Sequence, residues 1–326
     1  MHARRLGKTG YDVSEVGFGA WGIGADWGAV DDRDSLAAMH AAVDAGVTFF
    51  DTADVYGDGR SERLVGQLLR ERPEQLVVAT KFGRRVPFDL ASYTYESFRG
   101  WLERSRENLG VEAVDLVQLH CLPWETYYTP SVFEACDRLV EEGLVRAYGA
   151  SVEKVEEALK AIAYPGVATV QIVFNAFRQR PAELFLREAA ERDVGVIARV
   201  PLASGLLTGK FDRDTRFAAD DHRAYNRHGE SFDVGETFAG VDYETGLEAV
   251  AELRPLVPEG ATLAQLALRW ILDFPAVSTV IPGAKTVEQA RANAAAAGLP
   301  PLPAETRAAI EDVYRRRVAP QVHQRW

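Results

Sequence analysis

The strongest constraint on the fold is a repeated alternation of short apolar segments with amphipathic segments. The apolar segments have the length and β-branched content of strands, and the amphipathic segments carry apolar residues at helical spacing. The predicted strands cover Glu15–Gly19, Val47–Asp51, Leu76–Lys81, Asp115–His120, Val145–Ser151, Ala168–Phe174, Val194–Val200 and Val277–Ile281. The predicted helices cover Arg33–Ala45, Ser61–Arg72, Tyr95–Leu109, Val132–Glu142, Lys154–Ile162, Ala182–Arg192, Tyr243–Leu256, Leu263–Asp273 and Val287–Ala296.

Several of the predicted strands are apolar on both faces, among them Val77–Ala79 and Leu116–Leu119. Parallel strands that are covered by helices have this character. Eight such strand–helix units in one chain predict a closed (β/α)8 TIM barrel. A doubly wound open sheet is the alternative. It normally carries a glycine fingerprint that opens a helix, and Gly17–Gly22 is rich in glycine but opens no predicted helix.

Segments at both ends of the chain extend the predicted barrel. Ala3–Val13, with Lys8-Thr9-Gly10 in its middle, predicts an N-terminal β-hairpin. Ala304–Arg316 predicts an extra C-terminal helix. No change of composition marks a linker, so we expect residues 1–326 to form a single domain.

Composition and charge exclude several classes of function. The formal net charge of −11 argues against nucleic acid as a main partner. Cys121 and Cys136 are too few for a disulfide framework, so a reducing cytoplasm is the expected compartment. We find no signal peptide and no apolar segment that is long enough to span a membrane. The spacing of His and Cys supports no metal site.

Four polar residues follow three consecutive predicted strands. Asp51, Lys81 and His120 each end a strand, and Tyr56 lies five residues after Asp51. Taken singly, each has an ordinary structural explanation: a turn residue, a lysine that reaches water, a hydrogen-bonded core histidine or a packed ring. In a barrel, however, neighbouring strand ends meet at one mouth, where reactive groups gather. We therefore expect the four side chains to converge.

The chemistry of this set fits the reduction of a carbonyl group. Hydride delivery to a carbonyl carbon leaves negative charge on the oxygen, which Tyr56 can protonate. A free tyrosine has a pKa of about 10, and a nearby ammonium such as Lys81 lowers it. Asp51 would hold that ammonium in place. His120 would orient the carbonyl through a hydrogen bond.

Three segments of the chain resemble the active-site segments of the aldo-keto reductase superfamily. They are Asp51–Gly57 (DTADVYG), Thr80–Gly83 (TKFG) and Gln118–His120 (QLH). Gly57–Glu62 (GDGRSE) is similar to the bacterial members. The resemblance extends over nearly the whole chain and implies a catalytic tetrad of Asp51, Tyr56, Lys81 and His120, a nicotinamide cofactor and a small-molecule carbonyl substrate. It does not specify an oligomeric state.

The same resemblance implies where the cofactor would bind. Ser151 and Gln171 match residues that hold the nicotinamide amide, and Pro201–Lys210 looks like the pyrophosphate loop, whose glycines let backbone amides approach phosphate. Ile281–Lys285 resembles the adenosine-phosphate site at a helix start, and Lys285 favours NADP(H) over NAD(H). The implied contacts are Ser151, Gln171, Arg199, Pro201, Leu202, Ser204, Gly205, Leu206, Lys210, Gly283, Ala284, Lys285, Gln289 and Asn293.

The chain departs from the family pattern at three positions. Val152 stands where an asparagine often follows the serine, and Ala292 stands where an acidic residue often meets the adenine. Arg199 stands where many members place an aromatic ring on the nicotinamide. Facing that ring, its charge would disfavour the cationic oxidised form and favour reduction. Alternatively, Arg199 turns away and pairs with an acid.

The substrate remains unspecified by the sequence. Trp21, Trp27, Phe82 and Trp124 are candidates to line the pocket, because loops at a barrel mouth determine specificity. The long loop Gly205–Asp242 is either a lid or a solvated loop of mixed charge. A second class of function, a cofactor-binding auxiliary subunit with slow turnover, is the alternative to an enzyme, since some members of the superfamily are ion-channel subunits.

Overall fold

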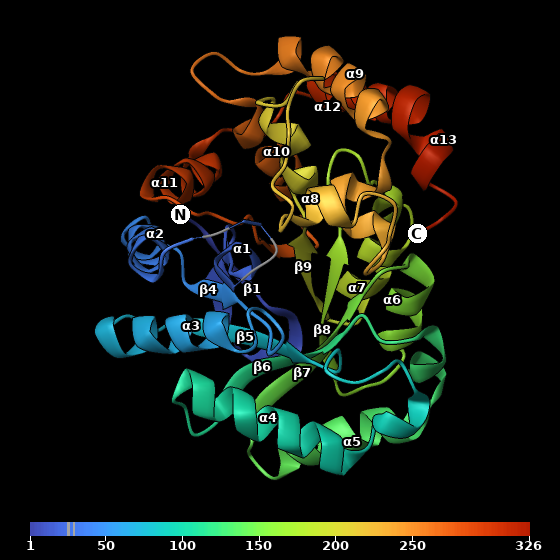
Figure 1. The fold of residues 1–326 in the computed structure, drawn as a ribbon. Coiled ribbons are helices and arrows are strands. Elements are labelled where there is room, and N and C mark those ends of the chain that lie inside the picture. Colours follow the sequence, from blue (N-terminus) through green and yellow to red (C-terminus); the bar gives the residue numbers. More distant parts are fainter. Residues whose placement is uncertain (25–26, 29) are drawn as a thin grey trace.

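The fold is a closed barrel of parallel strands surrounded by helices (Figure 1). The computed structural model describes residues 1–24, 27–28 and 30–326. Eight strands form one sheet in the consecutive order β3 to β10. Backbone hydrogen bonds then join the first and last strands: Gly17 N donates to Val280 O (2.8 Å) and Gly19 N to Pro282 O (3.1 Å). The consecutive order and this closure confirm the (β/α)8 barrel over the open sheet.

The observed elements agree closely with the predicted ones. The barrel strands are β3 (Phe18–Gly19), β4 (Phe49–Asp51), β5 (Val77–Phe82), β6 (Val114–His120), β7 (Val145–Val152), β8 (Val167–Val173), β9 (Gly195–Arg199) and β10 (Val277–Val280). The helices between and after them are α2 (Asp32–Asp44), α3 (Arg60–Glu71), α4 (Tyr95–Leu109), α5 (Pro130–Glu141), α6 (Val155–Ala161), α7 (Phe185–Glu191), α9 (Tyr243–Leu253), α10 (Leu263–Leu272), α11 (Val287–Ala295) and α12 (Ala304–Val313).

Three short α-helices of the described residues were not predicted, and one of them is α13 (Ala319–Val322) near the C-terminus. The glycine-rich segment after β3 does open a helix, the single turn α1 (Trp21–Gly24), which corrects the sequence-based expectation. The long loop after β9 also contains structure, namely the 3-10 turns η5 (Ala203–Thr208), η6 (Val234–Glu236) and η7 (Phe238–Gly240) and the helix α8 (His222–Tyr225). We call residues 211–242 the strap.

The barrel has an inner and an outer apolar core. The inner core consists of inward-facing side chains such as Phe49, Leu116 and Ile197. Leu6 and Val13 from the hairpin β1 (Ala3–Arg5) and β2 (Asp12–Ser14) pack against it and close the bottom of the barrel. The outer core lies between the strands and the helices and continues into the C-terminal helices α12 and α13 (Ala319–Val322). Polar chemistry is therefore left to the opposite end, the mouth.

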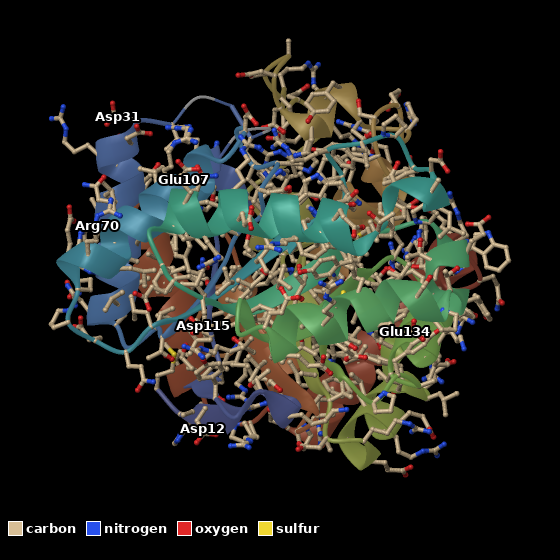
Figure 2. All side chains as sticks on the ribbon, turned by 90° about the horizontal axis from the view of Figure 1, so that it is seen from below. Asp12, Asp31, Arg70, Glu107, Asp115 and Glu134 are labelled. Atoms are coloured by element: carbon tan, nitrogen blue, oxygen red, sulfur yellow. The ribbon has the colours of Figure 1, made fainter. Side chains whose placement is uncertain are left out.

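Charged side chains cover the outside of the helix layer. Seen from below, α4 and α5 run side by side, and Glu107 on α4 and Glu134 on α5 are exposed to solvent (Figure 2). Asp31 and Arg70 project in the same way from the ends of α2 and α3. Among the described residues, no helix combines the length and apolar character that crossing a bilayer requires.

Candidate active site

Three neighbouring strand ends bring the predicted tetrad together. The ammonium of Lys81 lies 2.6 Å from Asp51 Oδ2 and 3.4 Å from the hydroxyl of Tyr56, and it also donates to Thr52 O at 2.9 Å. The ring of His120 meets that of Tyr56 edge to face, with centroids 5.8 Å apart. All four groups are buried or nearly so. The convergence that the spacing predicts is therefore present.

A layer of amides supports the carboxylate of Asp51 from below. Gln171 Nε2 donates to Asp51 Oδ1 at 2.7 Å, and Gln118 Nε2 donates to the same oxygen at 3.2 Å. One carboxylate oxygen of Asp51 thus accepts from Lys81, and the other accepts from the two glutamines. The arrangement fixes the ammonium and ties Gln171, a predicted cofactor residue, directly to the tetrad.

The pKa of Tyr56 differs from the expectation. Burial raises the pKa of the Tyr56 phenol above its ordinary value, because a phenolate in this site loses its hydration. Lys81 acts in the expected direction and lowers it, but the effect of burial is larger, and Asp51 and Glu236 add to the rise. Tyr56 is therefore a neutral phenol that retains its proton at neutral pH.

The protonation states of Lys81 and His120 complement this neutral phenol. Burial by itself would lower the pKa of Lys81, but the charge of Asp51 and the hydrogen bonds with Asp51 and Tyr56 outweigh it, and the pKa is raised. Burial, followed by the charges of Arg84, Lys81 and Arg199, holds the pKa of His120 well below its ordinary value. Lys81 is thus a permanent cation and His120 a neutral imidazole. Its Nδ1 has no hydrogen-bond partner among the described residues.

Two glycines allow the close packing that positions Tyr56. A Cβ on Gly24 would lie 2.7 Å from Tyr56 Cβ, and a Cβ on Gly57 would lie 2.4 Å from the carbonyl oxygen of Gly24. Gly57 also has a left-handed φ of +59°. Side chains at either position would push α1 and the Tyr56 loop apart.

The predicted pyrophosphate loop has an unusual backbone. Ala203, Ser204 and Gly205 follow one another with positive φ angles of 48°, 52° and 99°. Ala203 N donates to Val200 O at 3.0 Å and Gly205 N donates to Leu202 O at 2.9 Å, so internal backbone hydrogen bonds hold this tight turn. The side chain of Ser204 faces the strap, where it donates to Glu236 O and accepts from Phe238 N, so only its backbone is left for a cofactor.

The other predicted residues of this loop differ in exposure. Pro201 and Leu206 are buried, Leu202 is half-buried and Lys210 is exposed at the loop's end. A Cβ on Gly205 would lie 2.8 Å from the ring of Phe211, so a larger residue is excluded there.

The predicted adenosine-phosphate site forms a turn that α11 holds. Gln289 Oε1 accepts from Lys285 N at 2.8 Å, and Asn293 Nδ2 donates to Gly283 O at 3.1 Å. Gly283 is open, and Ala284 beside it is buried. The ammonium of Lys285 donates to Trp27 O, and burial lowers the pKa of Lys285. The side chains of Gln289 and Asn293 thus shape the turn.

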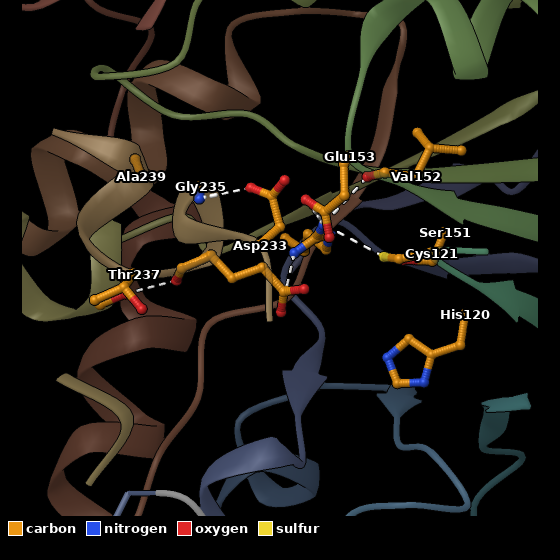
Figure 3. A network of polar contacts seen from close by, with 12 residues as sticks. His120, Cys121, Ser151, Val152, Glu153, Asp233, Gly235, Thr237 and Ala239 are labelled. Atoms are coloured by element: carbon orange, nitrogen blue, oxygen red, sulfur yellow. Dashed lines mark hydrogen bonds and ion pairs between the residues drawn. The ribbon is translucent and has the colours of Figure 1, made fainter. Parts of the chain in front are cut away.

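Arg199 pairs with acids, as the second of the two sequence-based alternatives states. Its guanidinium lies 2.8 Å from Glu153 Oε2 and 3.7 Å from Glu236 Oε2, and it donates to Val152 O at 3.1 Å. Beside this pair, Cys121 Sγ lies 3.5 Å from the hydroxyl of Ser151 (Figure 3). Arg199 is therefore part of a buried network and is not a lone cation at the mouth.

The four residues predicted to line the substrate pocket lie in different places. Trp21 lies beside Tyr56, and Trp27 packs edge to face on Trp21. Phe82 does not line a pocket, which corrects the prediction. It is fully buried and packs against Phe98 and Trp101 of α4. Strand residues alternate in direction, so Lys81 faces the barrel and Phe82 faces the helices.

Trp124 lies away from the other tryptophans, on an outer rim. It is 59% exposed and packs on Tyr128, beside a shallow hollow that Lys154 and Arg180 also line. No described contact joins it to the tetrad.

The strap contributes to the mouth, which supports the prediction of a lid over that of a solvated loop. The ring of His222 lies 4.8 Å from that of Trp21 and 4.4 Å from that of Trp27, and Phe232 lies 5.9 Å from Trp21. Sequence reasoning missed Phe232 and Glu236, because no local signal shows where a long loop folds back. It also missed Arg84 and Glu153, although each follows a predicted strand end by only two or three residues.

Comparison with known proteins agrees with this site. The model of the Aldo/keto reductase family matches residues 15–315. A probable voltage-gated potassium channel subunit beta from Oryza sativa subsp. japonica is 32% identical over 323 residues, which is 93% of both chains. The glycerol dehydrogenase AKR11B4 from Gluconobacter oxydans is 31% identical, with a TM-score of 0.80 over 97% of this chain and 96% of that chain.

A second solved structure is similar over the same length. It is an aldo/keto reductase from Klebsiella pneumoniae in complex with NADP and acetate, which is 25% identical, with a TM-score of 0.71 over 96% of this chain and 95% of that chain. The match of the family model to nearly the whole chain, and the tetrad at the mouth of the barrel, lead to one conclusion: the chain belongs to the aldo/keto reductase family.

Proposed function

We propose that this protein is an NADP(H)-dependent oxidoreductase that reduces an aldehyde or a ketone to an alcohol, with Tyr56 as the proton donor. The observation that carries the proposal is the contact of the Tyr56 hydroxyl with the Lys81 ammonium, which Asp51 holds in a buried ion pair. The Klebsiella relative in complex with NADP supports the choice of cofactor.

Tyr56 and Lys81 divide the proton chemistry between them. The reduced nicotinamide, when bound, supplies a hydride to the carbonyl carbon. The O–H bond of Tyr56 breaks as its proton moves to the carbonyl oxygen, which becomes the hydroxyl of the alcohol. The phenolate that remains is stabilised by the charge of Lys81, 3.4 Å away, until a proton from solvent restores the phenol.

His120 orients the substrate as a neutral hydrogen-bond donor. Because the pKa of His120 is held well below its ordinary value, the imidazole is neutral. It therefore has no imidazolium proton that would compete with the Tyr56 proton for transfer to the substrate. A neutral imidazole presents one N–H, and that N–H can bind the carbonyl oxygen. His120 thus places the carbonyl oxygen near the Tyr56 hydroxyl.

The residues present fit an extended dinucleotide phosphate. We assign the pyrophosphate to the loop Pro201–Lys210, and Ser151 and Gln171 lie at strand ends next to the tetrad. Lys285 stands just before α11, where a cation and a helix N-terminus both favour a phosphate. We assign the 2′-phosphate to Lys285 and the opening at Gly283 to the adenosine.

An aromatic wall borders the substrate side of Tyr56. Trp21, Trp27, His222 and Phe232 form it, with the first two from the loop after β3 and the other two from the strap. Flat rings that close around a polar acid favour small carbonyl compounds with an apolar body.

We also infer that residues 1–326 form one domain. Because both cysteines are free and buried, we infer a reducing, cytoplasmic compartment.

A single assay tests this function. The protein is mixed with NADPH and a panel of aldehydes, ketones and sugars, and the absorbance of the reduced nicotinamide is followed. The proposal predicts turnover on at least one carbonyl and little or none with NADH. Tight binding of NADPH without turnover on any compound would contradict it and would favour an auxiliary subunit.

A further inference from the structure

Two arginines and two glutamates form a buried cluster beside the tetrad. Arg84 Nη2 lies 2.8 Å from Glu236 Oε1 and 3.4 Å from Glu153 Oε1. Arg199 Nη2 lies 2.8 Å from Glu153 Oε2, and Arg199 Nη1 lies 3.7 Å from Glu236 Oε2. Carboxylate oxygens of the two glutamates and the sulfur of Cys121 all lie within 4.8 Å of one another. We call these four charged residues the mouth cluster; Figure 3 labels Glu153 of this cluster, together with Cys121 and His120.

The mouth cluster is built into the same strand ends as the catalytic residues. Arg84 Nε donates to the carbonyl oxygen of His120 at 3.1 Å, and Arg199 donates to the carbonyl oxygen of Val152, next to Ser151. Glu236 comes from the strap, so the cluster also fastens the strap to the mouth. The net charge of the mouth cluster therefore acts electrostatically on any ligand that binds near Ser151 and His120.

The two carboxyl groups of the cluster do not share one state of ionisation. Burial raises the pKa of Glu153 above its ordinary value, although Arg199 acts against the rise and Glu236 adds to it. Burial would also raise the pKa of Glu236, but Arg84 and Arg199 overcome it and hold that pKa below its ordinary value. Two acids so close together rarely ionise together in a dry site. Glu153 is therefore the carboxyl group of the pair that keeps its proton to higher pH.

The other groups that face Glu153 do not take over this proton. Burial raises the pKa of the Cys121 thiol to about 12, so the thiol stays neutral. Asp233, which precedes η6, raises the pKa of Glu153 further. Burial lowers the pKa of Arg178, which follows β8, but its guanidinium stays charged at neutral pH and donates to the carbonyl oxygens of Gly235 and Ala239. None of these residues replaces Glu153 as the group that changes charge near neutral pH.

We propose that Glu153 and Glu236 share a proton between Arg84 and Arg199, and that this proton sets the affinity for oxidised relative to reduced cofactor. The inference rests on the proposed function, because it needs a nicotinamide near Ser151. With Glu153 protonated, the mouth cluster has two positive charges and one negative charge. With Glu153 ionised, the charges balance.

The sign of the effect follows from the charge of the cofactor. Oxidised nicotinamide carries a positive charge and reduced nicotinamide carries none, so a net positive cluster weakens the oxidised form selectively. As the pH rises through the raised pKa of Glu153, this residue loses its proton and the penalty disappears. By linkage, the oxidised cofactor lowers the pKa of Glu153 and releases protons when it binds. Glu153 thus acts on the cofactor through its charge, as a positioning residue, and contacts no reacting atom.

Binding measurements over a range of pH test the proposal. The dissociation constants of NADP⁺ and NADPH are measured from pH 6.5 to 9.5. Both forms carry the 2′-phosphate, so the effect of its titration cancels in the ratio of the two constants. In the parent protein, the ratio of the NADP⁺ constant to the NADPH constant should fall by about three- to tenfold as the pH rises. In Glu153→Gln, which keeps the uncharged form at every pH, the ratio should stay constant.

A matched control separates this effect from the loss of any buried acid. Glu15→Gln removes a buried carboxylate that pairs with Arg4 at 2.9 Å, at the opposite end of the barrel. Its ratio should follow that of the parent. Calorimetry of NADP⁺ binding at pH 8, in buffers of different ionisation enthalpy, should show proton release in the parent and in Glu15→Gln but none in Glu153→Gln.

The outcomes keep this inference distinct from the proposed function. A parent ratio that does not change with pH, or an equal change in parent and Glu153→Gln, overturns the inference. In either case the proposed function stands, provided that NADPH binds and carbonyl reduction proceeds. Absence of NADPH binding at every pH overturns the proposed function itself.

Discussion

The ring of Trp21 lies nearly parallel to that of Tyr56, with centroids 6.1 Å apart and an angle of 19° between the planes. Trp21 belongs to α1, and Gly24 at the end of this helix touches Tyr56 from the other direction. The short helix α1 thus fixes the position of the Tyr56 ring in two ways, by packing of the Trp21 ring and by the close approach of Gly24. The hydroxyl is left to face Lys81 and the mouth.

The first prediction concerns this close contact. Gly24→Ala would place a Cβ 2.7 Å from Tyr56 Cβ, so α1 or the Tyr56 loop must shift. A displacement of the proton donor by a fraction of an ångström should lower kcat by roughly tenfold or more. Gly22→Ala is the control, since its nearest neighbour would be Trp27 at 3.9 Å. Steady-state kinetics decide the point, and equal rates in both variants would speak against the contact.

The second prediction concerns the buried ion pair of Lys81 and Asp51. Lys81→Met leaves the Asp51 carboxylate buried without its counter-charge and should lower the free energy of unfolding by about 3–5 kcal/mol. The double variant Asp51→Asn/Lys81→Met removes both charges and should recover part of that loss. Urea unfolding of the parent, Lys81→Met, Asp51→Asn and the double variant measures it. A double variant as unstable as the sum of both single variants would show that the pair is not coupled.

The third prediction concerns Asp54, whose carboxylate oxygens are buried without a hydrogen-bond partner among the described residues. Burial raises its pKa to about 7. Between about pH 4 and pH 7 the unfolded chain therefore loses this proton while the folded chain keeps it, so the group's contribution to stability is lost as the pH rises. Asp54→Asn should gain on the order of 1–4 kcal/mol over the parent at pH 8, and the gain should vanish near pH 4.

A control of opposite sign is available four residues further along. Arg104 and Arg85 lower the pKa of the exposed Asp58 to about 2, so its contribution is present above about pH 4 and is lost in acid. Asp58→Asn should therefore be less stable than the parent at pH 8. Chemical denaturation at each pH measures both variants, and a gain for Asp54→Asn that is independent of pH would exclude the ionisation of Asp54 as its cause.

The fourth prediction concerns the choice between NADPH and NADH. A charged lysine on a phosphate contributes about 1.5–3 kcal/mol, so Lys285→Ala should weaken NADPH by roughly tenfold to a hundredfold and NADH much less. Arg291→Ala, which removes an exposed cation from the same helix, should change neither. Fluorescence titration with both cofactors gives the constants. If Lys285→Ala weakens the binding of NADPH and NADH equally, Lys285 does not recognise the 2′-phosphate.

Local patterns predicted the barrel and the tetrad, because both depend on strands and on their ends. Asp51, Lys81 and His120 are placed by periodicity alone, since each closes an apolar segment in a parallel sheet. Phe82 was misplaced for a related reason. It follows Lys81 directly, and the alternation of strand side chains turns it toward α4.

The remaining features depend on contacts between residues that are distant in sequence. Arg199 meets Glu236 only because the strap returns over the mouth, and Ser204 uses its hydroxyl on the same strap. The raised pKa of Tyr56 depends on how the mouth surrounds its hydroxyl, which the motif does not encode. Such properties require the three-dimensional fold.

The most direct test of the account is the rate of the chemical step in Tyr56→Phe. This variant keeps the ring beside Trp21 and His120 and removes only the hydroxyl that contacts Lys81. Single-turnover reduction of a carbonyl substrate, with the variant saturated by NADPH, should be slower than in the parent by on the order of 10²-fold or more, with an unchanged dissociation constant for NADPH. A rate near that of the parent would contradict Tyr56 as the proton donor.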